Sequence, residues 1–257
     1  MDLSPLSSVI MKGMNTALDF IYRFIPAHVN NRIVALIYDA GTLFRGSSEW
    51  AIRNRAHNEA ELKKLFRDRT DVMIENQAEL TMLRLGKQYT FSYGGCGAIA
   101  LHNLRVSLKE HMHAADTAEL FFEAERYGRA FFGKAGLSPK ALLRYLKRHG
   151  YACHVYYGTD SKTIDAMASK RNKENHGAFL YRTFLVTGYN NARSVHDRIH
   201  TVNISREAEG YVIHNGYRYD NERNCYTQSR AYRTLSDAVH HIDAAGYSKP
   251  ILVAGVQ

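Results

Sequence analysis

The run Tyr93-Gly94-Gly95-Cys96-Gly97-Ala98-Ile99-Ala100-Leu101-His102-Asn103-Leu104 places two glycines and a cysteine directly before a helical pattern. Leu101, Leu104 and Leu108 are spaced i, i+3 and i+7, which predicts one apolar face of a helix. The glycines permit a tight turn, so Cys96 is expected at the first turn of that helix. The free N–H groups of a helix start favour a thiolate. Cys96 is therefore the candidate nucleophile, and a small residue buried in a crowded turn is the alternative.

Composition places the chain among globular proteins. Of its 257 residues, 45% are hydrophobic and 23% are charged, so a sizeable core is expected. Lysine and arginine number 34 against 25 acidic residues, which gives a net charge of +9. The basic residues are scattered along the chain, which is typical of a solvated surface and argues against nucleic-acid binding.

Cysteine usage argues for a reducing compartment. Cys96, Cys153 and Cys225 are widely spaced, and no CxxC pair indicates a zinc or redox site. Cys153 and Cys225 are expected to be structural. No signal peptide and no run of apolar residues long enough for a membrane span is evident, so a cytoplasmic location is predicted. Neither a metal nor an organic cofactor is implied.

The first part of the chain, residues 1–85, is predicted to be a helical accessory region. Residues 4–25 and 30–40 show helical apolar patterns, separated by Pro26, and residues 48–82 alternate in charge as on an exposed helix. An amphipathic helix lying on a membrane is the alternative for residues 4–25, but its polar face is too thinly basic to favour that.

The second part, residues 86–257, is predicted to be the catalytic domain. Helices are expected over 116–127, with Asp116 as the cap and Glu119 as its capping-box partner, and from Ser138-Pro139 to Gly150. Alternating or apolar runs then predict strands over 151–157, 178–186, 199–204, 210–215 and 250–256. Helices followed by an antiparallel sheet predict an α+β fold.

A cysteine nucleophile needs a base and a group that orients it. His200 lies in one predicted strand, and Asn215 ends the next, so the two are expected to lie close together and to act as base and orienting residue. An ordinary half-buried strand histidine is the alternative for His200. The rival bases are His176, His196 and His214, of which His214 is disfavoured because it neighbours Asn215 and faces the other side of the sheet.

An oxyanion formed during attack needs hydrogen-bond donors. The backbone N–H of Cys96 is one candidate. Gln88, eight residues upstream in the connecting loop, offers a neutral amide donor as the second, and a plain polar loop residue is the alternative.

Taken together, Gln88, Gly95-Cys96-Gly97, His200 and Asn215 resemble the papain-like cysteine peptidases, and most closely the bacteriocin-processing leader peptidase domains and their free-standing homologues. The resemblance covers about residues 86–220. The leader peptidases have Asp where this chain has Gly95, and Asp-Pro where it has Asn215-Gly216. The resemblance implies a papain-like fold and a bacterial hydrolase that cleaves a peptide or isopeptide bond with a Cys-His-Asn triad.

Other functions remain open for the same residues. An acyltransferase or a transglutaminase-like enzyme could use the same triad, because the acceptor is chosen by the pocket. A catalytically silent peptide-binding domain is a further alternative. Each of these predicts a peptide or protein as the partner, whereas the net charge alone would favour nucleic acid.

Overall fold

A computed structural model describes most of the chain beyond residue 26. The described residues are 27–67, 69–172, 177–189, 199–216, 219–220, 225–226, 231–242 and 249–257, together with residues 9, 12, 13 and 16. The predicted helix over 4–25 lies almost wholly outside them, as do His176 and His196. Within the described ranges, no helix combines the length and the apolar character needed to cross a bilayer.

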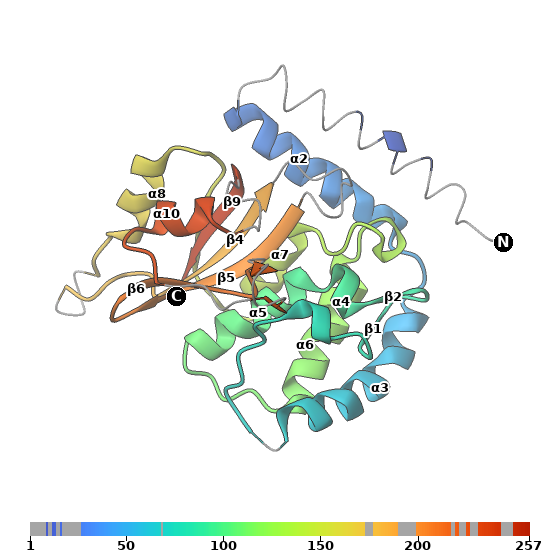
Figure 1. Ribbon diagram of the computed structural model, residues 1–257. Helices are drawn as coiled ribbons and strands as arrows, with labels where there is room; N and C mark the ends of the chain where they lie inside the picture. Colours follow the sequence, from blue (N-terminus) through green and yellow to red (C-terminus); the bar gives the residue numbers. More distant parts are fainter. Residues whose placement is uncertain are drawn as a thin grey trace.

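The first half of the molecule is helical (Figure 1). Its α-helices are α2 (Ala27–Gly41), α3 (Glu49–Phe66), α4 (Phe91–Gly94), α5 (Cys96–Ser107), α6 (Ala114–Gly128) and α7 (Pro139–Arg148). Short 3-10 turns are η1 (Thr42–Phe44), η2 (Gln77–Glu79) and η3 (Phe131–Gly133), and β1 (Arg84–Leu85) pairs with β2 (Tyr89–Thr90) in a small hairpin.

Local capping explains where these helices begin. Ser138 caps α7 by accepting a hydrogen bond from the N–H of Ala141 at 3.3 Å, with Pro139 at the first helical position, as predicted. Helix α6 starts at Ala114 instead of after Asp116. The Asp116 carboxylate accepts from the N–H of His113 at 3.0 Å, so Asp116 is the third helical residue of a capping box. The predicted cap at Asp116 with Glu119 was therefore wrong by three residues.

The second half contributes a five-stranded antiparallel sheet. Its strands are β3 (Cys153–Tyr156), β4 (Thr183–Tyr189), β5 (Ile199–Glu207), β6 (Gly210–His214) and β9 (Lys249–Val256), in the order β3-β9-β4-β5-β6. Two helices, α8 (Ser161–Ala168) and α10 (Leu235–His240), and a small hairpin of β7 (Tyr219–Asp220) and β8 (Cys225–Tyr226) complete the described elements. The predicted α+β class is confirmed.

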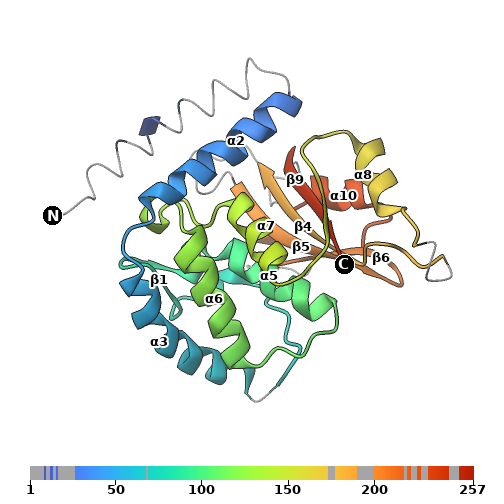
Figure 2. The ribbon, with the colours of Figure 1, turned by 180° about the vertical axis from the view of Figure 1, so that it is seen from behind.

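Helices cover both faces of the sheet (Figures 1 and 2). Helix α5 packs on β4 and β5, over a core that includes Leu185 and Leu252. Helices α8 and α10 cover the other face, where Val202 and Ile204 are buried. Residues on β5 therefore alternate between the α5 side and the α8–α10 side.

The predicted division of the chain at Gly86 runs through the larger core. Val34, Tyr38, Leu62, Phe66 and Leu85, all before Gly86, are buried in one cluster with the residues of α5, α6 and α7. Helix α3 packs along α6, and α2 packs on α7 and β9. This shared core argues against a separately folded domain that begins at Gly86.

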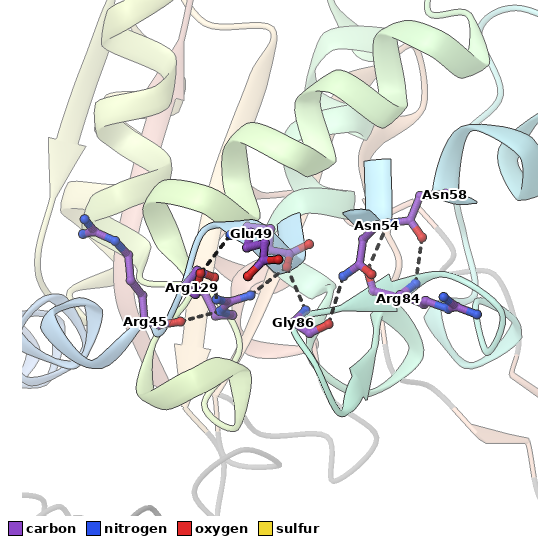
Figure 3. A network of polar contacts seen from close by, with 9 residues as sticks. Arg45, Glu49, Asn54, Asn58, Arg84, Gly86 and Arg129 are labelled. Carbon is purple, nitrogen blue, oxygen red and sulfur yellow. Dashed lines mark hydrogen bonds and ion pairs between the residues drawn. The ribbon is translucent and has the colours of Figure 1, made fainter. Parts of the chain in front are cut away.

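The β1–β2 hairpin is held by a buried polar network (Figure 3). Asn54 donates to the carbonyl of Gly86 at 2.9 Å, and Asn58 donates to the carbonyl of Arg84 at 2.9 Å. The Glu125 carboxylate accepts from the N–H of Gly86 at 2.8 Å and pairs with Arg129 at 2.7 Å. These contacts tie the segment upstream of Cys96 to α3 and α6.

Candidate functional site

Cys96 begins α5, as predicted, because the two preceding glycines allow a tight approach. Gly95 is the N-cap of α5, and a Cβ added there would lie 2.5 Å from the ring of Phe91. A Cβ on Gly94 would lie 3.1 Å from Leu85. The Gly-Gly pair therefore lets α4 turn directly into α5 and fixes the sulfur of Cys96 at the helix N-terminus.

The sulfur of Cys96 is half-buried against strand β5. The backbone N–H groups of Thr201, Gly97 and Cys96 hydrogen-bond it. Burial raises the pKa of the Cys96 thiol, and these hydrogen bonds, which favour the thiolate, only partly offset that rise. The prediction that the helix start favours the thiolate was therefore wrong in its net effect: the resting group is a thiol.

His200 lies at the start of β5, beside Thr201. Its side chain is buried, with its Nε2 2.7 Å from the main-chain oxygen of Asn215. A carbonyl oxygen can only accept, so Nε2 carries the proton and Nδ1 is left as the basic nitrogen. Burial lowers the pKa of His200 to about 4, against the opposing effect of this hydrogen bond. His200 is thus neutral, in a defined tautomer, at neutral pH.

Cys96 and His200 approach the same peptide unit of β5. Alternation puts the His200 side chain on the face of Val202 and Ile204, whereas Thr201 points toward α5. The sulfur contacts the N–H of Thr201, which belongs to the peptide bond that joins residues 200 and 201. Both residues therefore lie at the start of β5, but their side chains lie on opposite faces of the sheet, and their action as a pair stays a prediction.

Asn215 reaches His200 through its backbone instead of its side chain. It follows β6 with a φ of 62°, in the left-handed region that asparagine tolerates. Its side-chain Oδ1 accepts from the N–H of Gln77 at 2.9 Å, and its Nδ2 donates to Gln77 Oε1 at 3.3 Å. The contact that orients the imidazole is the main-chain carbonyl of Asn215. Every residue has such a carbonyl, so the sequence could not reveal this contact.

The role of Gln88 as the second oxyanion donor stays a prediction. Gln88 is exposed, in the turn between β1 and β2. Gln77 is the buried upstream amide: it contacts Asn215, and its Nε2 donates to the carbonyl of Ser92, in α4, at 3.1 Å. Gln77 therefore joins the His200 side of the site to the segment that leads into Cys96. No sequence signal marked Gln77, because it lies in a short 3-10 turn, η2, with no repeating pattern around it.

A second series of hydrogen bonds, which sequence reasoning missed, supports Asn215 on the face of the sheet opposite His200. Glu75 Oε1 lies 2.7 Å from His214 Nδ1, and Glu75 Oε2 accepts from the N–H of Asn215 at 3.1 Å. His214 Nε2 lies 2.8 Å from the hydroxyl of Ser205, which donates to Glu207 at 2.7 Å. Ser205 is only 1% exposed in the middle of β5, so this chain braces the strand ends and offers no accessible nucleophile.

Cys153 has a different environment from Cys96. It opens β3, and its thiol lies 3.8 Å from the carbonyl oxygen of Tyr151. Burial raises the pKa of the Cys153 thiol, and no backbone donor opposes that effect. The structural role predicted for Cys153 stays a prediction, and the side chain of Cys225 lies outside the described residues.

Compared with known proteins, the chain matches no protein family, no curated protein and no solved structure. Function is therefore inferred from the geometry of this chain alone.

Proposed function

We propose that this protein is a cysteine-dependent hydrolase of papain-like architecture that cleaves a peptide or isopeptide bond. The single observation that supports the proposal most is the contact of the Cys96 sulfur with the N–H of Thr201, the residue that follows His200 in β5; His200 itself is neutral and held in one tautomer. A thiol at a helix start and a neutral imidazole are the two groups that a nucleophile and its general base require.

The proposed reaction starts from a neutral pair. The Cys96 thiol proton moves to Nδ1 of His200 as the sulfur attacks the substrate carbonyl, so the imidazolium forms only during attack. The His200 side chain lies on the opposite face of β5 from the sulfur, so this transfer requires the start of β5 to rearrange until Nδ1 reaches the sulfur. The imidazolium then gives its proton to the leaving amine, which leaves a thioester on Cys96. Water, deprotonated by His200, hydrolyses that thioester and restores the thiol.

Oxyanion stabilisation is assigned to backbone and amide donors near the helix start. The Cys96 N–H is the first donor, as the sequence predicted. For the second donor, we prefer Gln77 to Gln88, because Gln77 is buried and contacts Ser92 and Asn215, whereas Gln88 is exposed.

Acyl transfer is the second candidate function. His200 is 3% exposed, so water has little access to the base in the resting site. A thioester shielded in this way lasts longer and can be captured by an amine. Hydrolysis and transfer share every step up to the thioester, and they differ only in the group that attacks it.

A library of peptides with a fluorogenic amide leaving group tests the proposed function. We expect release of the fluorophore by the wild type and none above background by Cys96→Ala, while Cys153→Ala retains the wild-type rate. Added glycine methyl ester separates the two candidates, because acyl transfer converts the acyl group to a new amide. No turnover and no acylation of Cys96 by any peptide would leave a silent binding domain of the same fold.

A further inference from the structure

A basic cavity lies on the helical side of the molecule, away from Cys96. It has a volume of about 490 Å³ and is bordered by η1, the end of α6 and the outer face of α7. Figure 2 shows α2, α6 and α7 side by side in this region. The inner face of α7, with Leu142, packs against Gly97 of α5. Helix α7 therefore separates this cavity from the proposed catalytic cysteine.

Four cationic side chains line the cavity: Arg45, Arg144, Lys147 and Arg148. Two carboxylates offset part of this charge, because Asp39 pairs with Arg144 at 2.7 Å and Glu123 lies 3.5 Å from Arg148. Among the residues that the structure describes, neither Arg45 nor Lys147 has an ion pair with a carboxylate. The cavity thus keeps an excess of positive charge within a concave wall, which concentrates anions.

The guanidinium of Arg148 and the backbone of Arg45 are held in place before any ligand arrives. The guanidinium of Arg148 lies over the ring of Tyr127 at 4.4 Å, and Tyr127 also lines the cavity. The carbonyl of Arg45 accepts from Arg129 at 2.7 Å, and Arg129 is fixed by its buried pair with Glu125. The side chain of Arg45 points away from this network (Figure 3). An ordered arginine such as Arg148 loses less conformational entropy on binding, and a guanidinium matches two phosphate oxygens at once.

We propose that this cavity binds a phosphate-bearing ligand with at least two negative charges. Its volume lies in the range of small-molecule sites. Such a phosphate can belong to a free metabolite or to a lipid headgroup. Leu43, which adjoins the lining residue Thr42, is 81% exposed at the same turn and would meet the acyl region if the source were a lipid. This site is independent of the proposed hydrolase activity.

Calorimetric titration with sodium pyrophosphate tests the free form, and co-sedimentation with phosphatidylcholine vesicles containing phosphatidic acid tests the headgroup form. The double variant Arg45→Gln/Lys147→Gln removes two cavity charges that have no carboxylate partner among the described residues. The matched control Lys63→Gln/Lys64→Gln removes two charges from the far end of α3, roughly 20 Å along the helix from its start. Hydrogen bonds to charged groups are among the stronger ones, so the cavity variant should bind at least about tenfold more weakly.

Binding of pyrophosphate that only the cavity variant weakens supports the proposal with a free phosphate as its source. Binding of the acidic vesicles alone, again weakened only by the cavity variant, supports it with a lipid source. Equal weakening by the control variant would show attraction to the overall charge of +9 and would overturn the proposal. The absence of binding in both arms would also overturn it.

Discussion

At the scale of single residues, the environment of Cys96 and His200 sets their protonation states. Burial acts on both groups in the same sense, since it disfavours whichever form is charged. The thiol is kept protonated and the imidazole is kept neutral. The two groups therefore differ from a preformed thiolate–imidazolium pair, and the proposed hydrolysis would need proton transfer during attack.

Asn215 provides a prediction at this scale, because its backbone contacts His200 and its side chain contacts Gln77. Asn215→Gly keeps the carbonyl and the positive φ, so we expect labelling of Cys96 by an electrophile to stay within about threefold of the wild type. Asn215→Ala should be about 1 kcal/mol less stable than Asn215→Gly, because a Cβ is strained at this φ. Urea denaturation and labelling kinetics measure the two effects. If Asn215→Gly labelled as slowly as His200→Ala, the side chain would be the orienting group after all.

At the scale of elements, the β1–β2 hairpin depends on one buried ion pair. The side chains of Arg129 and Glu125 are 3% and 1% exposed, and the same carboxylate holds Gly86. Removing one partner of a buried pair leaves an unpaired charge, whereas removing a surface pair costs little.

We therefore expect Glu125→Gln to lower the free energy of unfolding by about 3–5 kcal/mol. Glu49→Gln, which breaks the exposed pair with Arg53 on α3, is the matched control and should lose less than about 1 kcal/mol. Chemical denaturation measures both values. Similar losses in the two variants would mean that the buried pair does not anchor the hairpin.

At the scale of the whole molecule, one core joins the chain on both sides of Gly86. A fragment of residues 86–257 would lack five buried side chains of this core: Val34, Tyr38, Leu62, Phe66 and Leu85. The side chains that pack against them would become exposed. At about 1.5–3 kcal/mol for each of these five apolar side chains, the loss is about 7.5–15 kcal/mol, which is comparable to the 5–15 kcal/mol that stabilises a typical domain. We expect the fragment to lack a cooperative unfolding transition in calorimetry. A sharp transition would restore the predicted boundary.

Sequence reasoning found the features that depend on neighbours along the chain. The starts of α5 and α7 follow from the Gly-Gly turn and from Ser138-Pro139, and the alternating strands follow from their period. The sequence analysis predicted a helical region from residue 48 to residue 82, whereas α3 ends at Phe66. The reason lies far along the chain, because Asn103 bonds both the N–H and the carbonyl of Ile74 at 2.9 Å and holds an irregular segment.

Contacts between residues far apart in the chain also decide how much of the candidate site could be predicted. His200 and Asn215 could be paired from the sequence because two consecutive strands place them together. The contact of Gln77 with Asn215 joins residues 138 positions apart, and no local pattern encodes it. Whether a side chain or a carbonyl of Asn215 meets the imidazole depends on the conformation of one residue after β6, which is visible only in three dimensions.

The central claim is that Cys96 and His200 act together. The most direct test is the rate at which a peptidyl vinyl sulfone modifies the protein between pH 6 and pH 9. Mass spectrometry then maps the modified residue. Because the pKa of the Cys96 thiol is raised, the rate should climb with pH instead of levelling off near pH 6. We expect the adduct on Cys96, a rate at least about 100-fold lower in His200→Ala and His200→Gln, and no change in Cys153→Ala. His200→Gln keeps a donor for the Asn215 carbonyl, so it separates lost proton transfer from lost structure. An adduct on Cys153, or an unchanged rate in both His200 variants, would contradict the account.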